Sequence, residues 1–142
     1  MINSVGSSTD IGAGQRLGKT VLQSGIVVAT GVAADTALPE ALTVGKNAET
    51  GVDVYNGVRD GKDVYVGITN DLLRRGAEHG DRFGLARLTQ TSVTRGEARA
   101  IEQAQIVRNP GFENTRNSIS PNHDWYKQAV DWGEQWLQGK GL

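Results

Sequence analysis

Residues 52–68 read Val-Asp-Val-Tyr-Asn-Gly-Val-Arg-Asp-Gly-Lys-Asp-Val-Tyr-Val-Gly-Ile, and this stretch decides the fold. Apolar and polar side chains alternate on both sides of Asp60-Gly61, which is the pattern of two strands joined by a tight turn. We expect the three-residue turn Arg59-Asp60-Gly61, which would set Tyr55 directly across from Tyr65. A two-residue turn would instead pair Tyr55 with Val66 and send the two tyrosines to opposite faces.

The hairpin is followed by signals for a helix over about residues 71–79. Thr69 or Asn70 can cap its start, Asp71 suits the positive end of its dipole, and Gly80 can end it in a left-handed conformation. A short strand is expected at residues 85–91, so that the hairpin gains a third strand. These elements predict an α+β fold with a small central antiparallel three-stranded sheet flanked by helices.

Two further helices are predicted in the last third of the chain. Thr94 and Glu97 have the spacing of a capping box, which starts an alanine-rich helix that ends before Asn109-Pro110. Residues 111–122 have the composition of an ordered loop, and Ser120-Pro121 can start a last helix. Apolar residues recur there at helical spacing and predict a core-facing stripe: Trp125, Ala129, Trp132 and Trp136.

Aromatic residues are absent from residues 1–50, although the 142-residue chain has eight of them from Tyr55 onward. Residues 1–50 are rich in small residues, so we expect a linker or low-complexity lead-in there and a folded domain over residues 51–142. The apolar run at residues 21–34 is interrupted by polar residues and is too short to span a bilayer, so no membrane anchor is expected.

The charge of the chain is nearly balanced, at −1 overall, so nucleic acid could be attracted only by a local patch. Between residues 71 and 116 there are eight arginines and six acidic residues, which is a weak excess of positive charge. Arginine suits planar contacts to phosphate, but ordinary solvated arginines are as good an explanation for each of them. The absence of cysteine excludes disulfides, thiolate nucleophiles and zinc–thiolate sites.

Arg75 and His79 share one face of the predicted helix at residues 71–79 and could hold an anion between them. Ordinary ion pairs of Arg75 with Asp71 and of Arg74 with Glu78 would explain the same pattern without any function. Glu102 lies beside an apolar stripe, where an unpaired carboxylate is costly. It could bind Mg²⁺, or it could pair with Arg99 one helical turn away.

These residues together resemble the GIY-YIG endonuclease family. Tyr65-Val66-Gly67 matches the second element of the family motif, and Arg75 follows at the family spacing. Asp53-Val54-Tyr55 keeps the tyrosine of the first element but not its glycine, and residues 97–103 are similar to the family's glutamate helix. The resemblance covers about residues 52–120.

The resemblance implies a metal-dependent endonuclease, with DNA as the expected substrate. Glu102 would bind Mg²⁺ or Mn²⁺, Tyr55 with His79 would position or deprotonate the attacking water, and Arg75 would stabilise charge on the phosphoryl oxygens. Two further roles are implied: Tyr65 would hydrogen-bond within the site, and either Asn114 or Asn117 would brace it. A binding module that keeps the fold without cleaving, and that holds nucleic acid or a partner protein, is the alternative.

More narrowly, residues 64–70 and 117–121 are similar to the versions found at the carboxy-terminal ends of bacterial polymorphic toxins. This resemblance implies a DNase toxin of interbacterial competition. Such a toxin is secreted or delivered as part of a larger protein, acts in the target-cell cytoplasm and is neutralised by a cognate immunity protein.

Two other motifs point elsewhere. Residues 13–20 read Ala-x-x-x-x-Gly-Lys-Thr, the loose form of a phosphate-binding loop, but no clear strand precedes them. His79 and His123 are too far apart in the sequence for the local spacing of a histidine-based metal-finger nuclease. We therefore favour neither interpretation.

Overall fold

The structure is a computed structural model and describes residues 36–142. The strands are β2 (Asp53–Arg59), β3 (Lys62–Thr69) and β4 (Gly84–Arg87), and they form one antiparallel sheet in the order β3-β2-β4. The α-helices are α1 (Leu72–His79), α2 (Arg95–Arg108) and α3 (Tyr126–Gly139). Short 3-10 helices occur at η1 (Glu40–Leu42), η2 (Gly45–Ala48) and η3 (Gly80–Arg82). The expected α+β class, with a three-stranded antiparallel sheet and flanking helices, is confirmed.

The hairpin turn differs from the expected one. Asp60 and Gly61 have φ angles of 55° and 76°, and Arg59 pairs with Lys62, so the turn has two residues with left-handed backbone. The register then shifts within the ladder, because Val58 pairs with Asp63 whereas Gly57 pairs with Tyr65. The prediction that Tyr55 pairs with Tyr65 is therefore wrong.

The register shift nevertheless brings the two tyrosines to one face of the sheet. Tyr55 pairs with Gly67 and Tyr65 pairs with Gly57, so each tyrosine lies across from a glycine and diagonal to the other tyrosine. The extra residue on β3 is a β-bulge, which restores the shared face that a plain two-residue turn would have removed.

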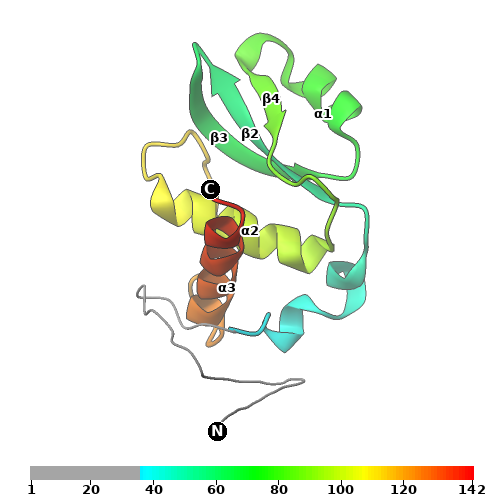
Figure 1. Cartoon of the computed structure of the whole chain (residues 1–142), viewed down its shortest axis with the longest axis vertical. Coiled ribbons are helices and arrows are strands. Elements are labelled where there is room, and N and C mark those ends of the chain that lie inside the picture. Colours follow the sequence, from blue (N-terminus) through cyan, green and yellow to red (C-terminus); the bar gives the residue numbers. More distant parts are fainter. Residues whose placement is uncertain (1–35) are drawn as a thin grey trace, which may run out of the picture. The chain divides into compact units, whose positions relative to one another are not determined.

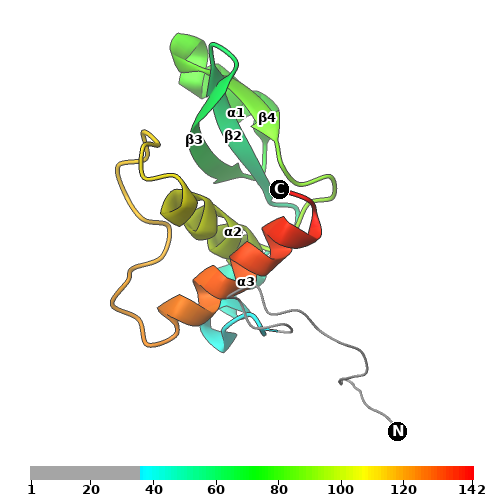
Figure 2. The ribbon, with the colours of Figure 1, turned by 60° about the vertical axis from the view of Figure 1, so that its left-hand side comes forward.

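The opposite face of the sheet packs on α2 and α3. Val54 and Val66 are fully buried there with Ile101 of α2 and Leu137 of α3. Figures 1 and 2 show α2 and α3 side by side beneath the sheet, whereas α1 lies apart from both. The sheet thus separates a deep core on one face from the two tyrosines on the other.

The third strand is shorter than expected. β4 ends at Arg87 rather than near residue 91, and it pairs with β2 from Val58–Gly84 to Tyr55–Arg87. Beyond it, the Thr89 hydroxyl donates to Asp53 and accepts from the Val54 amide, so a side chain replaces the ladder there.

The segment before residue 51 contributes to the core. Leu42 of η1 is fully buried and clusters with Ala100, Ile119 and Ala129. Its carbonyl oxygen would lie 1.8 Å from a Cβ atom at Gly96, so only glycine allows this approach to α2. The packed core therefore begins earlier in the chain than the expected boundary near residue 51.

Helix α2 begins as expected and α3 does not. The Thr94 hydroxyl accepts from the Glu97 amide, and the Glu97 carboxylate accepts from the Thr94 amide, which completes the predicted capping box. Ser120 instead makes a local turn by accepting from the Asn122 amide, and α3 starts only at Tyr126. The prediction that Ser120-Pro121 begins the last helix is wrong.

The tryptophan stripe of α3 packs against the core at its margins. Trp132 and Trp136 are partly buried against the cluster beneath the sheet, and Trp125 against the cluster that contains Leu42. The residues buried most deeply are Ala129, Gly133 and Leu137. At Gly133 a Cβ atom would lie 2.2 Å from the Ala100 carbonyl oxygen, so glycine sets the close approach of α3 to α2.

The phosphate-loop-like motif at residues 13–20 and the apolar run at residues 21–34 lie outside the described residues. Within residues 36–142, no helix is long and apolar enough to cross a membrane.

Candidate active site

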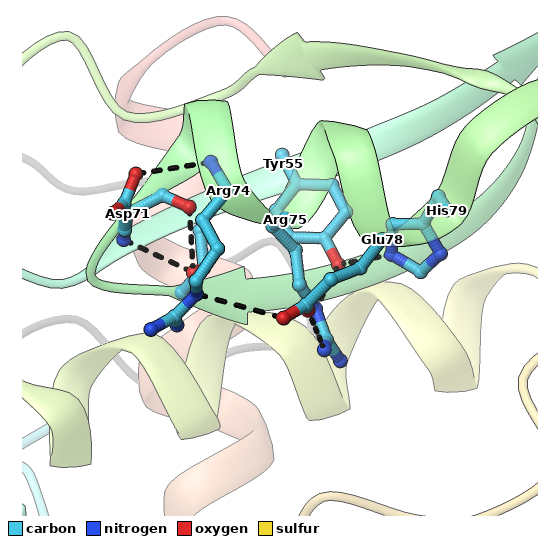
Figure 3. Close-up of polar contacts among 7 residues, drawn as sticks. Tyr55, Asp71, Arg74, Arg75, Glu78 and His79 are labelled. Carbon is cyan, nitrogen blue, oxygen red and sulfur yellow. Dashed lines mark hydrogen bonds and ion pairs between the residues drawn. The ribbon is translucent and has the colours of Figure 1, made fainter.

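The hydroxyl of Tyr55 lies between two side chains of α1. It is 2.9 Å from Nε2 of His79 and accepts a longer hydrogen bond, 3.4 Å, from Nε of Arg75 (Figure 3). These three residues come from β2 and from successive turns of α1, so the spacing of Arg75 and His79 does create a shared polar site. Tyr55 itself is fully buried, which fixes the position of its hydroxyl.

The glycine of Tyr65-Val66-Gly67 makes room for this arrangement. A Cβ atom at Gly67 would lie 2.3 Å from the Tyr55 hydroxyl oxygen, so any side chain there would displace the ring. Gly57 plays the same part for the ring of Phe83, which would lie 2.6 Å from a Cβ atom. Both glycines are needed because an aromatic ring crosses the strand at that point.

Tyr65 joins an aromatic cluster beside the Tyr55 hydroxyl. Its ring centroid lies 6.3 Å from that of Tyr55, 5.5 Å from that of His79 and 5.0 Å from that of Phe83. His79 also packs 4.6 Å from Phe83. These contacts hold the imidazole by its faces and edges and leave its ring nitrogen for Tyr55.

Of the two ordinary ion pairs considered for α1, that of Arg74 with Glu78 is present and that of Arg75 with Asp71 is not. Arg75 pairs with Glu78 at 2.8 Å, and Arg74 is 3.6 Å from the same carboxylate. Asp71 does not pair with Arg75 but caps the helix, since its side chain accepts from the Arg74 amide (Figure 3). The Thr69 hydroxyl in turn accepts from the Asp71 amide, and the predicted cap, Thr69 or Asn70, lies one or two residues before the actual one.

Burial keeps both Tyr55 and His79 neutral near pH 7. The pKa of Tyr55 is raised because its burial disfavours the charged form, although the hydrogen bond from Arg75 acts in the opposite direction. The pKa of His79 is lowered by burial and then by the positive charges of Arg75 and Arg82. A neutral imidazole therefore faces a protonated phenol.

Glu102 lies on α2 at the margin of the same site. It lines a polar recess of about 350 Å³ together with Tyr65 and residues 114–118. Burial raises its pKa to about 7, while a hydrogen bond with the Ser118 side chain and the charges of Arg99 and Arg75 lower it. Tyr65 lines this recess and packs beside the rings of Tyr55 and His79, so Glu102 lies near that cluster.

The expected ion pair of Glu102 with Arg99 does not form. Arg99 donates instead to the Asn47 side chain and to the Ser118 carbonyl oxygen, at 3.1 Å and 2.9 Å. Glu102 is thus a partly buried carboxyl without a strong cationic partner among the described side chains.

Asn114 and Asn117 both line the recess, so the structure brings together both candidates. The side chain of Asn114 pairs with the backbone of β3 as a neighbouring strand would. Its amide oxygen accepts from the Val66 N–H at 3.0 Å, and its amide nitrogen donates to the Val66 carbonyl at 2.8 Å. Asn117 accepts from Gln103 at 2.9 Å. Asn114 covers the outer edge of β3, and Asn117 joins the recess loop to α2.

Gln103 is the residue that sequence reasoning missed. It is fully buried; its amide nitrogen donates to Asn117 and Tyr126, and its oxygen accepts from the backbone amides of Ser118 and Ile119. One side chain thus holds the loop that forms the wall opposite Tyr65. The available signal was its spacing, since Gly96, Ala100 and Gln103 follow at i, i+4 and i+7 on the buried face of α2.

The recess has the donor chemistry that a hard divalent cation needs. Mg²⁺ and Mn²⁺ are held by one or two carboxylates, with water and phosphate oxygens in the other positions. Glu102 supplies a carboxylate, and the amide and hydroxyl oxygens of Asn117 and Ser118 lie on the same wall. Within residues 36–142 no group of three or more acidic or histidine ligands occurs, so this would be a single-carboxylate site. His123 stacks on Trp125 and is not part of it.

Comparisons with known proteins find no match: no protein-family model, no curated protein and no solved structure is similar to this chain.

Proposed function

We propose that this protein is a divalent-metal-dependent endonuclease that hydrolyses phosphodiester bonds, with DNA as its substrate and a fold of the GIY-YIG kind. The observation that carries the proposal is the Tyr55 hydroxyl, which is bonded to both His79 and Arg75. Tyr65, whose ring packs beside those of Tyr55 and His79, lines a recess together with Glu102. A general base, a fixed cation and a metal-binding carboxylate are the groups that phosphodiester hydrolysis needs.

The hydrogen bonds support a relay rather than a tyrosinate base. Neutral His79 accepts the Tyr55 proton at Nε2, while the Tyr55 oxygen takes a proton from the attacking water. The raised pKa of Tyr55 and the lowered pKa of His79 favour this division, because the phenol stays protonated and the imidazole keeps its lone pair at neutral pH. Arg75 orients the phenol oxygen and places its charge beside the phosphoryl group.

A Mg²⁺ or Mn²⁺ ion bound by Glu102 would neutralise charge on the phosphate and stabilise the leaving oxygen. Because the pKa of Glu102 is raised to about 7, the carboxyl group must lose its proton for the metal to bind. Asn114 and Asn117 hold the walls of the recess, and the Tyr65 hydroxyl would hydrogen-bond within it.

Cleavage of supercoiled plasmid by the full chain tests this function, with Mg²⁺ or Mn²⁺ and with chelator. We expect nicking with metal only, reduced by about 10²- to 10³-fold in Glu102→Ala and in Arg75→Gln, because each removes a group that acts on charge in the transition state. Arg95→Gln is the matched control, since Arg95 pairs with Glu49 away from the recess. No cleavage by the unmutated protein, or full cleavage by both variants, would refute the proposal.

A second candidate is a non-catalytic module that binds nucleic acid or a partner protein with the same fold. The observation that favours it is the Glu102 carboxyl, which is largely protonated below pH 7. In that case the plasmid is bound with and without metal and is never cut.

The wider biological role that we propose rests on the similarity of residues 64–70 and 117–121 to polymorphic toxins. The protein would be a DNase toxin of interbacterial competition, delivered as part of a larger secreted protein into the target-cell cytoplasm and held inactive by an immunity protein. Co-expression tests this role: the chain alone should arrest growth of a bacterial host, and Glu102→Ala should not.

A further inference from the structure

Two arginines that form no ion pair within residues 36–142 lie near Tyr65. The guanidinium of Arg82 lies 6.0 Å from the centroid of the Tyr65 ring and 5.0 Å from that of Phe83. Arg116 lines the recess that Tyr65 shares with Glu102. The two come from segments far apart in the sequence, η3 and the loop before α3, and meet only through the fold.

Most other arginines of the described chain are neutralised. Six of them form ion pairs within residues 36–142, namely Arg59, Arg74, Arg75, Arg87, Arg95 and Arg108. Arg99 is occupied by Asn47 and by the Ser118 carbonyl. Within this part of the chain, Arg82 and Arg116 are thus the arginines whose side chains form neither an ion pair nor a hydrogen bond, although the charge of Arg82 helps to lower the pKa of Glu113.

The position of these charges is more informative than their number. The nearly balanced charge of the chain gives no general attraction for a polyanion, yet Arg116 lines the recess and Arg82 lies beside Tyr65, which lines it too. Arg82 lies over the ring of Phe83, which leaves its N–H groups for an incoming acceptor. A polyanion with regularly spaced phosphates can reach both arginines and the recess that Tyr65 lines.

We propose that Arg82 and Arg116 bind backbone phosphates of duplex DNA on the two sides of the phosphate that enters the Glu102 recess. The inference rests on the proposed function and specifies the path of its substrate, which would pass over Tyr65 from η3 to the loop at residues 114–118. Arg75 acts on the central phosphate, and Arg82 and Arg116 fix the register of the strand.

The test is the salt dependence of DNA binding by the full chain in chelator, where no cleavage occurs. Each phosphate contact contributes about 0.9 to the slope of log binding constant against log salt concentration for duplex DNA. With a short fluorescein-labelled duplex and anisotropy as the readout, Arg82→Gln and Arg116→Gln should each lower the slope by about 1, and the double variant by about 2.

Matched variants keep the result interpretable. Arg95→Gln and Arg108→Gln remove arginines that are paired with Glu49 and Glu134, and they should leave the slope unchanged. Arg82→Lys and Arg116→Lys keep the charge and should keep most of the slope, which separates lost contacts from lost folding. Equal slopes for Arg82→Gln, Arg116→Gln and the two control variants would overturn the inference.

Failure of this inference is distinguishable from failure of the nuclease proposal. Cleavage with metal but unchanged slopes in Arg82→Gln and Arg116→Gln would reject the phosphate path and leave the nuclease in place. Reduced slopes without any cleavage would support the path and reject the nuclease. No binding of the duplex in chelator would reject the path by itself.

Discussion

The two helices that supply the candidate active site are held in very different ways. Helix α2, which carries Glu102, has seven buried residues and packs against both the sheet and α3. Helix α1, which carries Arg75 and His79, has none, and its Leu73 is 90% exposed. The Glu102 side is therefore part of the core, whereas the Tyr55–His79 side depends on a surface helix that should open locally at much lower cost.

The largest expected effect is the difference in stability between adding a methyl group to α2 and adding one to α1. Gly96→Ala in α2 would place Cβ 1.8 Å from the Leu42 carbonyl oxygen, and we expect a loss of about 3 kcal/mol in the free energy of unfolding. Gly76→Ala in α1 meets only Leu85, at 3.7 Å, and should gain up to about 1 kcal/mol from better helix propensity. Urea unfolding measures both, and losses of similar size would contradict the contrast between the helices.

Gln103→Leu should produce the next largest effect, a loss of about 2 kcal/mol. The substitution leaves the buried amide groups of Ser118 and Ile119 without an acceptor. Because the recess loop loses its attachment to α2, cleavage should fall as well, mainly through a higher KM for plasmid. Gln138→Leu, at an exposed position of α3, is the control and should stay within about 0.5 kcal/mol of the unmutated protein. Unchanged stability of Gln103→Leu would show that the loop is held by other contacts.

Glu102→Gln should reveal the cost of keeping a carboxyl group at the edge of the core. The pKa of Glu102 in the folded protein is about 7, above its ordinary 4.5, so its stabilising contribution is complete below pH 4.5 and is lost as the pH rises through 7. The variant should match the unmutated protein at pH 4 and exceed it at pH 8. The difference between the two pKa values sets an upper limit of about 3 kcal/mol, and the partial exposure of the group reduces the expected gain to about 2 kcal/mol.

Glu134 is the control, because its contribution to stability should change with pH in the opposite direction. Its pKa is lowered by the hydrogen bond from Arg108, so its contribution is present above its ordinary pKa and is lost as the pH falls. Glu134→Gln should therefore lose stability at pH 8 and little at acidic pH. Thermal unfolding at the two pH values measures the direction of the stability change in both variants. If added Mg²⁺ binds at Glu102, it should raise the melting temperature of the unmutated protein at pH 8 and leave that of Glu102→Gln unchanged.

Local sequence signals predicted the elements of the fold but not the register between them. The capping box at Thr94 and the hairpin at Asp60-Gly61 depend on neighbouring residues, and both are present. The β-bulge that sets Tyr55 against Gly67 depends on what packs over the sheet, and no local pattern marks it. Leu42 was missed for a related reason, because its segment is short and becomes buried only against Gly96 of a distant helix.

In the candidate site, too, local signals were visible in the sequence whereas contacts between distant segments were not. Arg75, His79 and Glu102 could be selected because charged residues at helical spacing are visible in a sequence. The structure places Arg75 and His79 on the Tyr55 hydroxyl and Glu102 in the recess that Tyr65 lines. The contacts that surround these three residues could not be predicted from the sequence. Glu78 rather than Asp71 pairs with Arg75, and Gln103 and Arg99 act on a loop that lies beyond α2 in the sequence.

The smallest effect concerns the charge of His79 on the exposed helix α1. Burial lowers the pKa of His79 most, Arg75 lowers it more than Arg82 does, and Glu78 raises it. Arg75→Gln should therefore raise the pKa of His79 toward its ordinary value, Arg82→Gln should raise it less, and Glu78→Gln should lower it further. Titration of the imidazole by NMR measures all three, with His123 as a reference outside the site. Since the proposed cleavage would need the neutral imidazole, the acid limb of the rate profile should move in the same order and direction. A rate profile that follows Glu102 instead would place the controlling proton on the α2 side of the recess.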